Sequence, residues 1–124
     1  MSIPSFDLRA VRNGRSTHIA PCGELDIATT PELEQALADA TASAVAEIVL
    51  DLRELTFMDS TGLRALAQAN TRADARGVAL SIIRGPRQIE RVLEISGLGS
   101  LLPLVDAPPA EGAGGDGAGA PQRE

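Results

Sequence analysis

Hydrophobic and polar residues alternate along this chain in segments of the length of strands and helices. The run Phe6–Val11 alternates apolar and polar side chains, which is typical of a strand with one solvent-exposed face, and Asn13-Gly14 predicts a tight hairpin turn. A second strand is expected at Ser16–Cys22. Because Pro21 removes one backbone donor from this strand, we expect an edge or a bulge near its end.

Three helices are predicted by apolar residues at helical spacing between start and stop signals. The first follows Thr29-Thr30-Pro31-Glu32, where a threonine cap, a proline in the first turn and an early glutamate are typical of a helix start. The second spans Ser60–Arg76 before Gly77, and the third follows Gly85-Pro86 and stops at Ser96-Gly97. The residues expected to face inward are Leu33, Leu37 and Ala40 in the first helix, Leu63, Leu66, Ala67 and Asn70 in the second, and Ile89, Val92 and Leu93 in the third.

Continuous apolar runs predict the buried strands. Glu47–Leu52 is rich in aliphatic residues and is expected to be the central strand, buried on both faces. Val78–Ile83 is a second such run, Leu101–Val105 predicts a short final strand, and a short loop is expected between residues 52 and 60. This order predicts an α/β fold with a small mixed, mostly parallel β-sheet, crossover helices and an antiparallel first pair of strands.

The chain of 124 residues is long enough for one domain, and 44% hydrophobic with 23% charged residues is ordinary globular composition. We assign residues 1–106 to this domain. Residues 107–124 are rich in Gly, Ala and Pro and bury too little apolar surface to offset their chain entropy, so they are predicted to be a disordered tail.

Charge and composition argue against several classes of function. A net charge of -6 and 2% aromatic residues disfavour binding to nucleic acid, which depends on clustered cations and stacking rings. The single Cys22 and the single His18 cannot form an internal disulfide or a metal cluster. No apolar run is long enough to cross a bilayer and no signal-peptide pattern precedes Phe6, so we expect a cytoplasmic protein without membrane insertion.

The most informative segment is Phe57-Met58-Asp59-Ser60-Thr61-Gly62-Leu63, which follows the predicted central strand. Ligands and partners of open parallel sheets bind at the carboxyl ends of the strands. A helix that starts at Ser60 also offers unpaired N–H groups and the positive end of its dipole, which would accommodate a phosphate on Ser60. The alternative is that Asp59, Ser60 and Thr61 only cap the helix.

The sequence does not support an enzymatic role for Ser60. A serine hydrolase needs an oriented base, whereas the only histidine lies on a predicted strand and no Gly-x-Ser-x-Gly elbow surrounds Ser60. Gly85-Pro86-Arg87 lacks both the Walker pattern and the dinucleotide fingerprint. We therefore expect no enzyme, no catalytic residue and no cofactor.

Four segments together resemble the STAS domain of bacterial anti-sigma factor antagonists, over about Phe6 to Val105. They are Gly23-Glu24-Leu25-Asp26, Ile48–Leu52, Phe57–Leu63 and Arg91–Leu98. The Asp-Ser-Thr-Gly-Leu element after a central strand is the most specific of the four.

The resemblance implies a regulatory switch. In that family a small serine kinase, which is also the anti-sigma factor, phosphorylates the serine that corresponds to Ser60. The unphosphorylated antagonist captures the kinase and frees the sigma factor, the phosphorylated form lets go, and a serine phosphatase resets it. Asp26 matches an aspartate that supports kinase contact. The remaining residues expected at the partner-binding face are Asp59, Thr61, Gly62, Leu63 and Arg64.

Two features near this face depart from the family pattern. Pro21-Cys22 stands where an apolar strand usually continues, and Arg64 stands where a small residue is common. Arg64 either alters which kinase fits or lies over the helix surface. The alternative function within the same fold is a constitutive interaction module, either a phospholipid-transporter subunit bound to its ATPase or a component of a stress-signalling scaffold.

Overall fold

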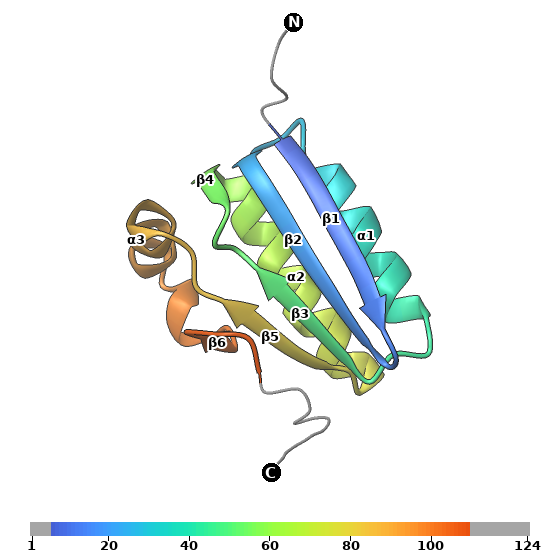
Figure 1. Cartoon of the computed structure of the whole chain (residues 1–124). Coiled ribbons are helices and arrows are strands. Elements are labelled where there is room, and N and C mark those ends of the chain that lie inside the picture. The colour runs from blue at the N-terminus through green and yellow to red at the C-terminus, as the bar shows by residue number, and fades with distance from the viewer. Residues whose placement is uncertain (1–5, 110–124) are drawn as a thin grey trace, which may run out of the picture.

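A computed structural model describes residues 6–109, which form a six-stranded sheet with helices α1 and α2 packed side by side on one face (Figure 1). The elements are β1 (Phe6–Asn13), β2 (Ser16–Leu25), α1 (Thr30–Ala42), β3 (Glu47–Asp51), β4 (Leu55–Met58), α2 (Ser60–Arg76), β5 (Ala79–Ile83), α3 (Arg87–Ser96), a 3-10 turn η1 (Leu98–Ser100) and β6 (Leu104–Val105). The strand order is β1-β2-β3-β5-β6, with β4 beside β2. Within the described residues only β1 and β2 pair antiparallel, so the predicted mixed, mostly parallel sheet is confirmed.

The β1–β2 hairpin turns one residue later than predicted. Asn13 pairs with Ser16 and the turn residues are Gly14 and Arg15. Gly14 has φ 65°, and every other positive φ of the described chain also belongs to a glycine. A positive φ at the first central position only is the pattern of a type II′ turn, which requires glycine there, whereas Asn-Gly at both central positions would make a type I′ turn.

Strand β2 changes partner along its length. Its first half pairs with β3 from Ser16 to Ile19, and its last three residues pair with β4 from Gly23 to Leu25. Pro21 lies in the interval between the two partners, where its missing N–H interrupts neither ladder. The irregularity predicted near the end of this strand is present as a register shift between Gly23 and Glu24.

Strand β4 was not predicted, because the sequence suggested a short loop after Leu52. It has four residues, of which Leu55 and Met58 are buried whereas Thr56 and Phe57 are exposed. A segment this short shows neither a clear alternation nor a continuous apolar run, so periodicity did not indicate a strand. Ser60 therefore follows the carboxyl end of β4, not that of the central strand β3.

The buried face of α2 is rotated relative to the prediction. Of the expected inward residues only Leu66 is fully buried, whereas Leu63, Ala67 and Asn70 are intermediate. The buried set is Gly62, Ala65, Leu66, Ala69 and Ala73. Alanines occur on several sides of this helix, and their small apolar side chains mark the buried stripe only weakly. In α3, Ile89 and Leu93 are buried as expected and Val92 packs against the core from its edge.

A charged cluster lies on the sheet face opposite the core helices. The Asp51 carboxylate accepts two hydrogen bonds from the Arg53 guanidinium, at 3.0 and 2.8 Å, and lies 3.2 Å from Nε2 of His18. The Asp51 side chain is only 9% exposed. Burial acts to raise the pKa of Asp51, but the hydrogen bonds from Arg53 and His18 outweigh it and lower that pKa to about 2.

The predicted boundary after residue 106 falls near the end of the described chain. The last described strand, β6, ends at Val105, and residues 107–109 belong to no helix or strand. Residues 110–124 of the predicted tail lie outside the described residues.

Gly85, between β5 and α3, is expected to tolerate no side chain. A Cβ on Gly85 would lie 2.8 Å from the backbone oxygen of Leu52, which cannot move aside without moving the end of β3. Gly85→Ala should therefore lower the free energy of unfolding by roughly 1–3 kcal/mol, measured by urea denaturation. Gly99→Ala is the matched control, since its Cβ would meet no atom closer than 3.6 Å. Equal stability of the two variants would contradict the assigned contact.

The Asp51 cluster predicts an acid-sensitive part of the stability. The pKa of Asp51 falls on folding from 3.8 to about 2, so its contribution is complete above about pH 4 and is lost as the pH falls towards 2. Solvent screens the half-exposed Arg53, so we expect the Asp51 cluster to contribute roughly 1–2 kcal/mol to the free energy of unfolding. Urea unfolding between these pH values should show this loss in the wild type and not in Asp51→Asn, with the exposed Asp74→Asn as control. If Asp51→Asn lost as much stability as the wild type between about pH 4 and pH 2, the assignment would be refuted.

Candidate functional site

The candidate site is built where β2 and β4 end side by side. Leu25 and Met58 are paired in the register of the two strands, and the next residue of each chain segment is an aspartate, Asp26 or Asp59. The Asp59 amide donates to the Leu25 carbonyl at 3.2 Å, which ties the two segments together one residue beyond the last pair. The structure therefore brings the two acidic motifs to one edge of the sheet.

Asp59 is the N-cap of α2. Its carboxylate accepts hydrogen bonds from the backbone amides of Thr61 at 2.9 Å and Gly62 at 3.2 Å, and it also accepts one from the Thr61 hydroxyl. The hydrogen bond from the Thr61 side chain is the largest cause that lowers the pKa of Asp59, and the backbone amides of Gly62, Thr61 and Ile27 lower it further. Asp59 is thus held as an anion at the positive end of the helix dipole.

This cap corrects the expectation of unpaired N–H groups in the first turn of α2 for the amides of Thr61, Gly62 and Leu63. The amides of Thr61 and Gly62 bond to the Asp59 side chain, and the Leu63 amide donates to the Asp59 carbonyl at 3.1 Å. A carboxylate one residue before the helix reaches these donors without strain, so it occupies the position that an anion would take.

Ser60 and Thr61 have different surroundings, although they are adjacent. Ser60 is the first residue of α2 and is exposed, whereas Thr61 is half-buried and its hydroxyl is bonded to Asp59. Neither is the cap, so the capping alternative holds for Asp59 alone. Of the two hydroxyls, that of Ser60 is the one presented to solvent.

Asp26 organises the turn that precedes α1. Its carboxylate accepts from the amides of Ala28 at 3.0 Å and Thr29 at 3.1 Å, and its carbonyl accepts from the Thr30 amide at 2.8 Å. Thr29 is the N-cap of α1, as predicted, but its side chain makes no capping hydrogen bond, because the Thr29 hydroxyl donates to the Glu24 carbonyl at 2.7 Å. Asp26 therefore shapes the loop beside Ser60 through the backbone and not through a hydrogen bond to the Ser60 side chain.

Of the other predicted partner-binding residues, Gly62 and Leu63 pack against the core and Arg64 is exposed to solvent. Gly62 is buried, and a Cβ there would lie 2.6 Å from Cγ of Met58, so only glycine allows this close approach of α2 to β4. Leu63 is partly buried against the core. Arg64 is exposed and lies four residues after Ser60, which places the two on the same face of the helix.

Two exposed apolar side chains at this edge were not predicted from the sequence. Ile27, in the loop after Asp26, is 76% exposed, and Phe57, three residues before Ser60, is 49% exposed. Large apolar side chains this exposed are candidates for partner contact. The sequence offered no signal for them, because exposed and buried apolar residues look alike without coordinates.

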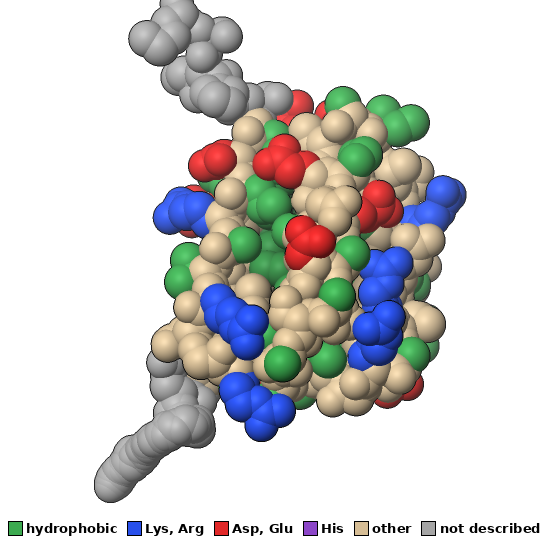
Figure 2. Space-filling view, turned by 90° about the vertical axis from the view of Figure 1, so that its right-hand side faces the viewer, with side chains coloured by type: hydrophobic (Ala, Val, Ile, Leu, Met, Phe, Trp, Pro, Cys, Tyr) green, Lys and Arg blue, Asp and Glu red, His purple; other side chains and the backbone are tan. Residues whose placement is uncertain are grey.

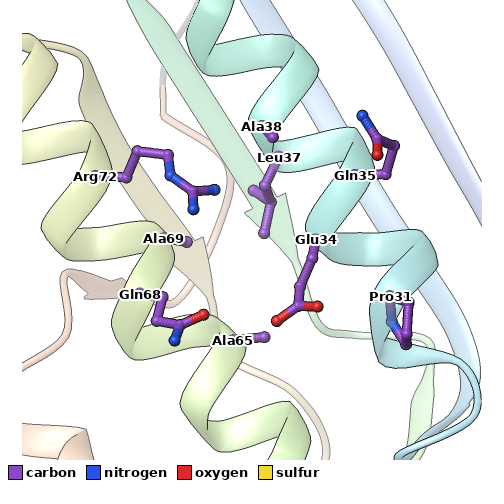
Figure 3. Close-up of a pocket in the computed structure, with 9 residues that line it drawn as sticks. All are labelled: Pro31, Glu34, Gln35, Leu37, Ala38, Ala65, Gln68, Ala69 and Arg72. Atoms are coloured by element: carbon purple, nitrogen blue, oxygen red, sulfur yellow. The ribbon is translucent and has the colours of Figure 1, made fainter.

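A groove between α1 and α2 begins near the same end of the molecule (Figure 3). It has a volume of about 420 Å³, with alanines and Leu37 along its floor. Figure 3 shows Glu34 of α1 with Gln68 and Arg72 of α2 pointing towards this groove. Its walls carry both signs of charge, which suits the polar surface of a protein segment better than a compact anion.

The described chain contains neither a candidate metal site nor a candidate membrane-spanning helix. Residues 6–109 contain no group of three or more His, Cys, Asp or Glu side chains that could hold a metal ion. None of the helices in this part of the chain is both long enough and apolar enough to cross a membrane.

Comparison with known proteins is consistent with this geometry. The anti-sigma-B factor antagonist of Staphylococcus aureus is 34% identical over 80 residues, which cover 64% of this chain and 74% of the relative. An anti-sigma factor antagonist from Mycobacterium paratuberculosis has the same fold, with a TM-score of 0.75 and 25% identity over 86% of this chain and 92% of its own. The antagonist SpoIIAA in its unphosphorylated form aligns with a TM-score of 0.69 and 24% identity, over 84% and 89% of the two chains.

The family comparison covers nearly all of the described chain. The family described as "Mlab, STAS domain" matches residues 8–105, from β1 to β6. This range contains the strand pair, the Asp26 turn and the capped start of α2 from which the site is built. The chain therefore belongs to the STAS-domain family of anti-sigma factor antagonists.

Proposed function

We propose that this protein is a cytoplasmic anti-sigma factor antagonist that is switched by phosphorylation of Ser60. The unphosphorylated form binds an anti-sigma factor that is also a serine kinase, and this releases the sigma factor. The kinase transfers the terminal phosphoryl group of ATP to Oγ of Ser60, the bond to ADP breaks, and the hydroxyl proton passes to a base of the kinase. A serine phosphatase restores the free hydroxyl.

The observation that carries this proposal is the exposed Ser60 hydroxyl at the start of a helix that Asp59 already caps. An acceptor hydroxyl must reach the active site of a kinase, and Ser60 is exposed whereas the Thr61 hydroxyl is bonded to Asp59. Support also comes from the related antagonist of S. aureus and from the fold, which is known in Bacillus SpoIIAA in a phosphorylated form as well.

Charge explains how phosphorylation ends binding without refolding. A phosphate on Ser60 adds about 1.5 to 2 negative charges at pH 7. The amides of Thr61 and Gly62 are bonded to the Asp59 carboxylate, so they do not neutralise this charge, and the ionised Asp59 adds its own. A partner surface that fits the neutral serine next to Asp59 meets a strongly anionic surface after phosphorylation. A loss of about 2.7 kcal/mol of binding free energy is a hundredfold release.

A second function is favoured by one observation, the Mlab description of the matching family. In this alternative the chain is a constitutive interaction module, such as a subunit bound to a transporter ATPase or a scaffold component. Partner binding would then not depend on the state of Ser60, so the experiment on Ser60 distinguishes the two functions.

Ser60→Ala should capture the cognate kinase from a native lysate and hold it, because this variant cannot be phosphorylated. With the purified kinase, Ser60→Ala should match the affinity of the unphosphorylated protein, and Ser60→Asp should bind at least about 100-fold more weakly, as measured by calorimetry. After incubation with ATP, mass spectrometry should locate the phosphate of the wild type on Ser60 and leave Thr61 unmodified.

The control for added charge is Ser100→Asp, at an exposed serine beyond α3, which should bind like the wild type. Equal affinity of Ser60→Ala and Ser60→Asp for the captured partner would refute the switch and support the constitutive module. Phosphate on Thr61 alone would show that the acceptor was assigned wrongly.

Ile27 and Phe57 should contribute apolar contact to the same partner. We expect Ile27→Asp to weaken kinase binding by at least about tenfold, because it removes an anchor and adds a carboxylate to an acidic edge. Ile95→Asp is the matched control, since Ile95 is 77% exposed but lies near the end of α3. Both variants should keep the wild-type thermal midpoint. Equal binding by both variants would exclude Ile27 from the interface.

A further inference from the structure

Strand β1 forms one edge of the sheet (Figure 1), and β2 is its only strand partner within residues 6–109. The Arg15 carbonyl accepts from the amides of Ala46 and Glu47, so odd-numbered residues of β2 direct their backbone groups towards β3. Because this direction alternates along a strand, the even-numbered residues of β2 face β1, and they pair with odd-numbered residues there. The backbone groups of Phe6, Leu8, Ala10 and Arg12 therefore point outward, as donors and acceptors for a further strand.

In the first four residues of β1, the side chains are apolar on the helix side of the sheet and charged on the opposite face. Phe6 and Leu8 of β1 and Ala36 of α1 are only partly buried, although they pack against the core. Figure 2 looks onto this side of the molecule and shows an apolar hollow with charged side chains around it. On the opposite face of the sheet, Asp7 and Arg9 are exposed, and neither takes part in an ion pair within the described chain.

Charged side chains on an edge strand normally prevent pairing with other strands. Here the two charges have opposite signs and are two residues apart, so one antiparallel register converts them into ion pairs. If Leu8 lies opposite Leu8 of a second copy, Asp7 of each chain lies opposite Arg9 of the other. If the twofold axis lay at residue 9 instead, Arg9 would lie opposite Arg9, and if it lay at residue 7, Asp7 would lie opposite Asp7. Both registers are unfavourable, because like charges directly opposite each other repel.

The same register satisfies the backbone and the apolar side chains. Leu8 with Leu8, and Phe6 with Ala10, become the hydrogen-bonded pairs, because these residues have the outward-pointing backbone groups. Asp7 and Arg9 then form the non-hydrogen-bonded pairs, in which facing side chains are closest. Leu8 and Phe6 lie on the helix side of the joined sheet, where they cover the partly buried apolar positions of the other copy.

We propose that β1 is a homodimerisation edge, on which a second copy of this chain adds its own β1 antiparallel with Leu8 at the twofold axis. Asp7 and Arg9 determine the register and the choice of partner. The edge lies on β1 and not on the turn that carries Ser60, so this inference is independent of the proposed switch.

Charge reversal tests the proposal on the full-length chain. Sedimentation velocity over a concentration series should show a reversible dimer for the wild type. Asp7→Arg and Arg9→Asp should each raise the dissociation constant by about tenfold or more, because each replaces two ion pairs by two like-charge pairs. The double variant Asp7→Arg/Arg9→Asp should restore the dimer, and Asp74→Arg on exposed α2 should leave it unchanged.

Mixing separates the register from any effect on folding. An equimolar mixture of Asp7→Arg and Arg9→Asp should form heterodimers. One variant then carries arginine at both positions and the other carries aspartate at both, so like charges face each other in either homodimer and opposite charges face each other in the mixed dimer. A wild type that is monomeric up to millimolar concentration would overturn the proposal. So would single variants that dimerise like the wild type, or a mixture in which no heterodimer forms.

Discussion

The site depends on the pairing of the last residues of β2 with β4. Strand β2 is longer than β3, and its end would carry free backbone groups if β4 did not take over as partner from Gly23 to Leu25. This pairing brings two chain segments separated by more than thirty residues to one edge, so that Asp26 and Asp59 leave the sheet together. Without β4 the start of α2 would have no fixed position relative to the Asp26 turn.

Packing beneath the first turn of α2 holds this arrangement in place. The buried Gly62 lies so close to Met58 and Leu25 that even a Cβ would displace them. The helix is thereby set against the same two residues that form the last pair of β2 and β4. The motif thus combines the exposed Ser60 hydroxyl with a tightly packed first helical turn. A reaction at Ser60 therefore changes the molecular surface and leaves the packing of the core unchanged.

Sequence patterns predicted most elements of this fold, because the long strands and helices have clear periodicity and end signals. Helix α2 and its end at Gly77 agree with the prediction, since a left-handed residue at a helix end favours glycine. The errors have physical causes: β4 is too short for a pattern, and the alanines of α2 define its buried face poorly. At the site, the sequence identified Asp26 and Asp59 but could not show that their carboxylates bond to backbone amides, nor that Ile27 and Phe57 are exposed.

Asp59 links the structural and the electrostatic roles of the site. A helix start that lacked this carboxylate would offer its amides to a phosphate and so disperse part of the added charge. With Asp59 in that position, the amides of Thr61 and Gly62 already have an anionic partner, and its lowered pKa keeps that partner ionised. These amides then do not neutralise the charge of a phosphate on Ser60, and this charge acts on a partner surface bound at this edge. The same residue that stabilises the helix therefore makes phosphorylation act on the interface and not on the fold.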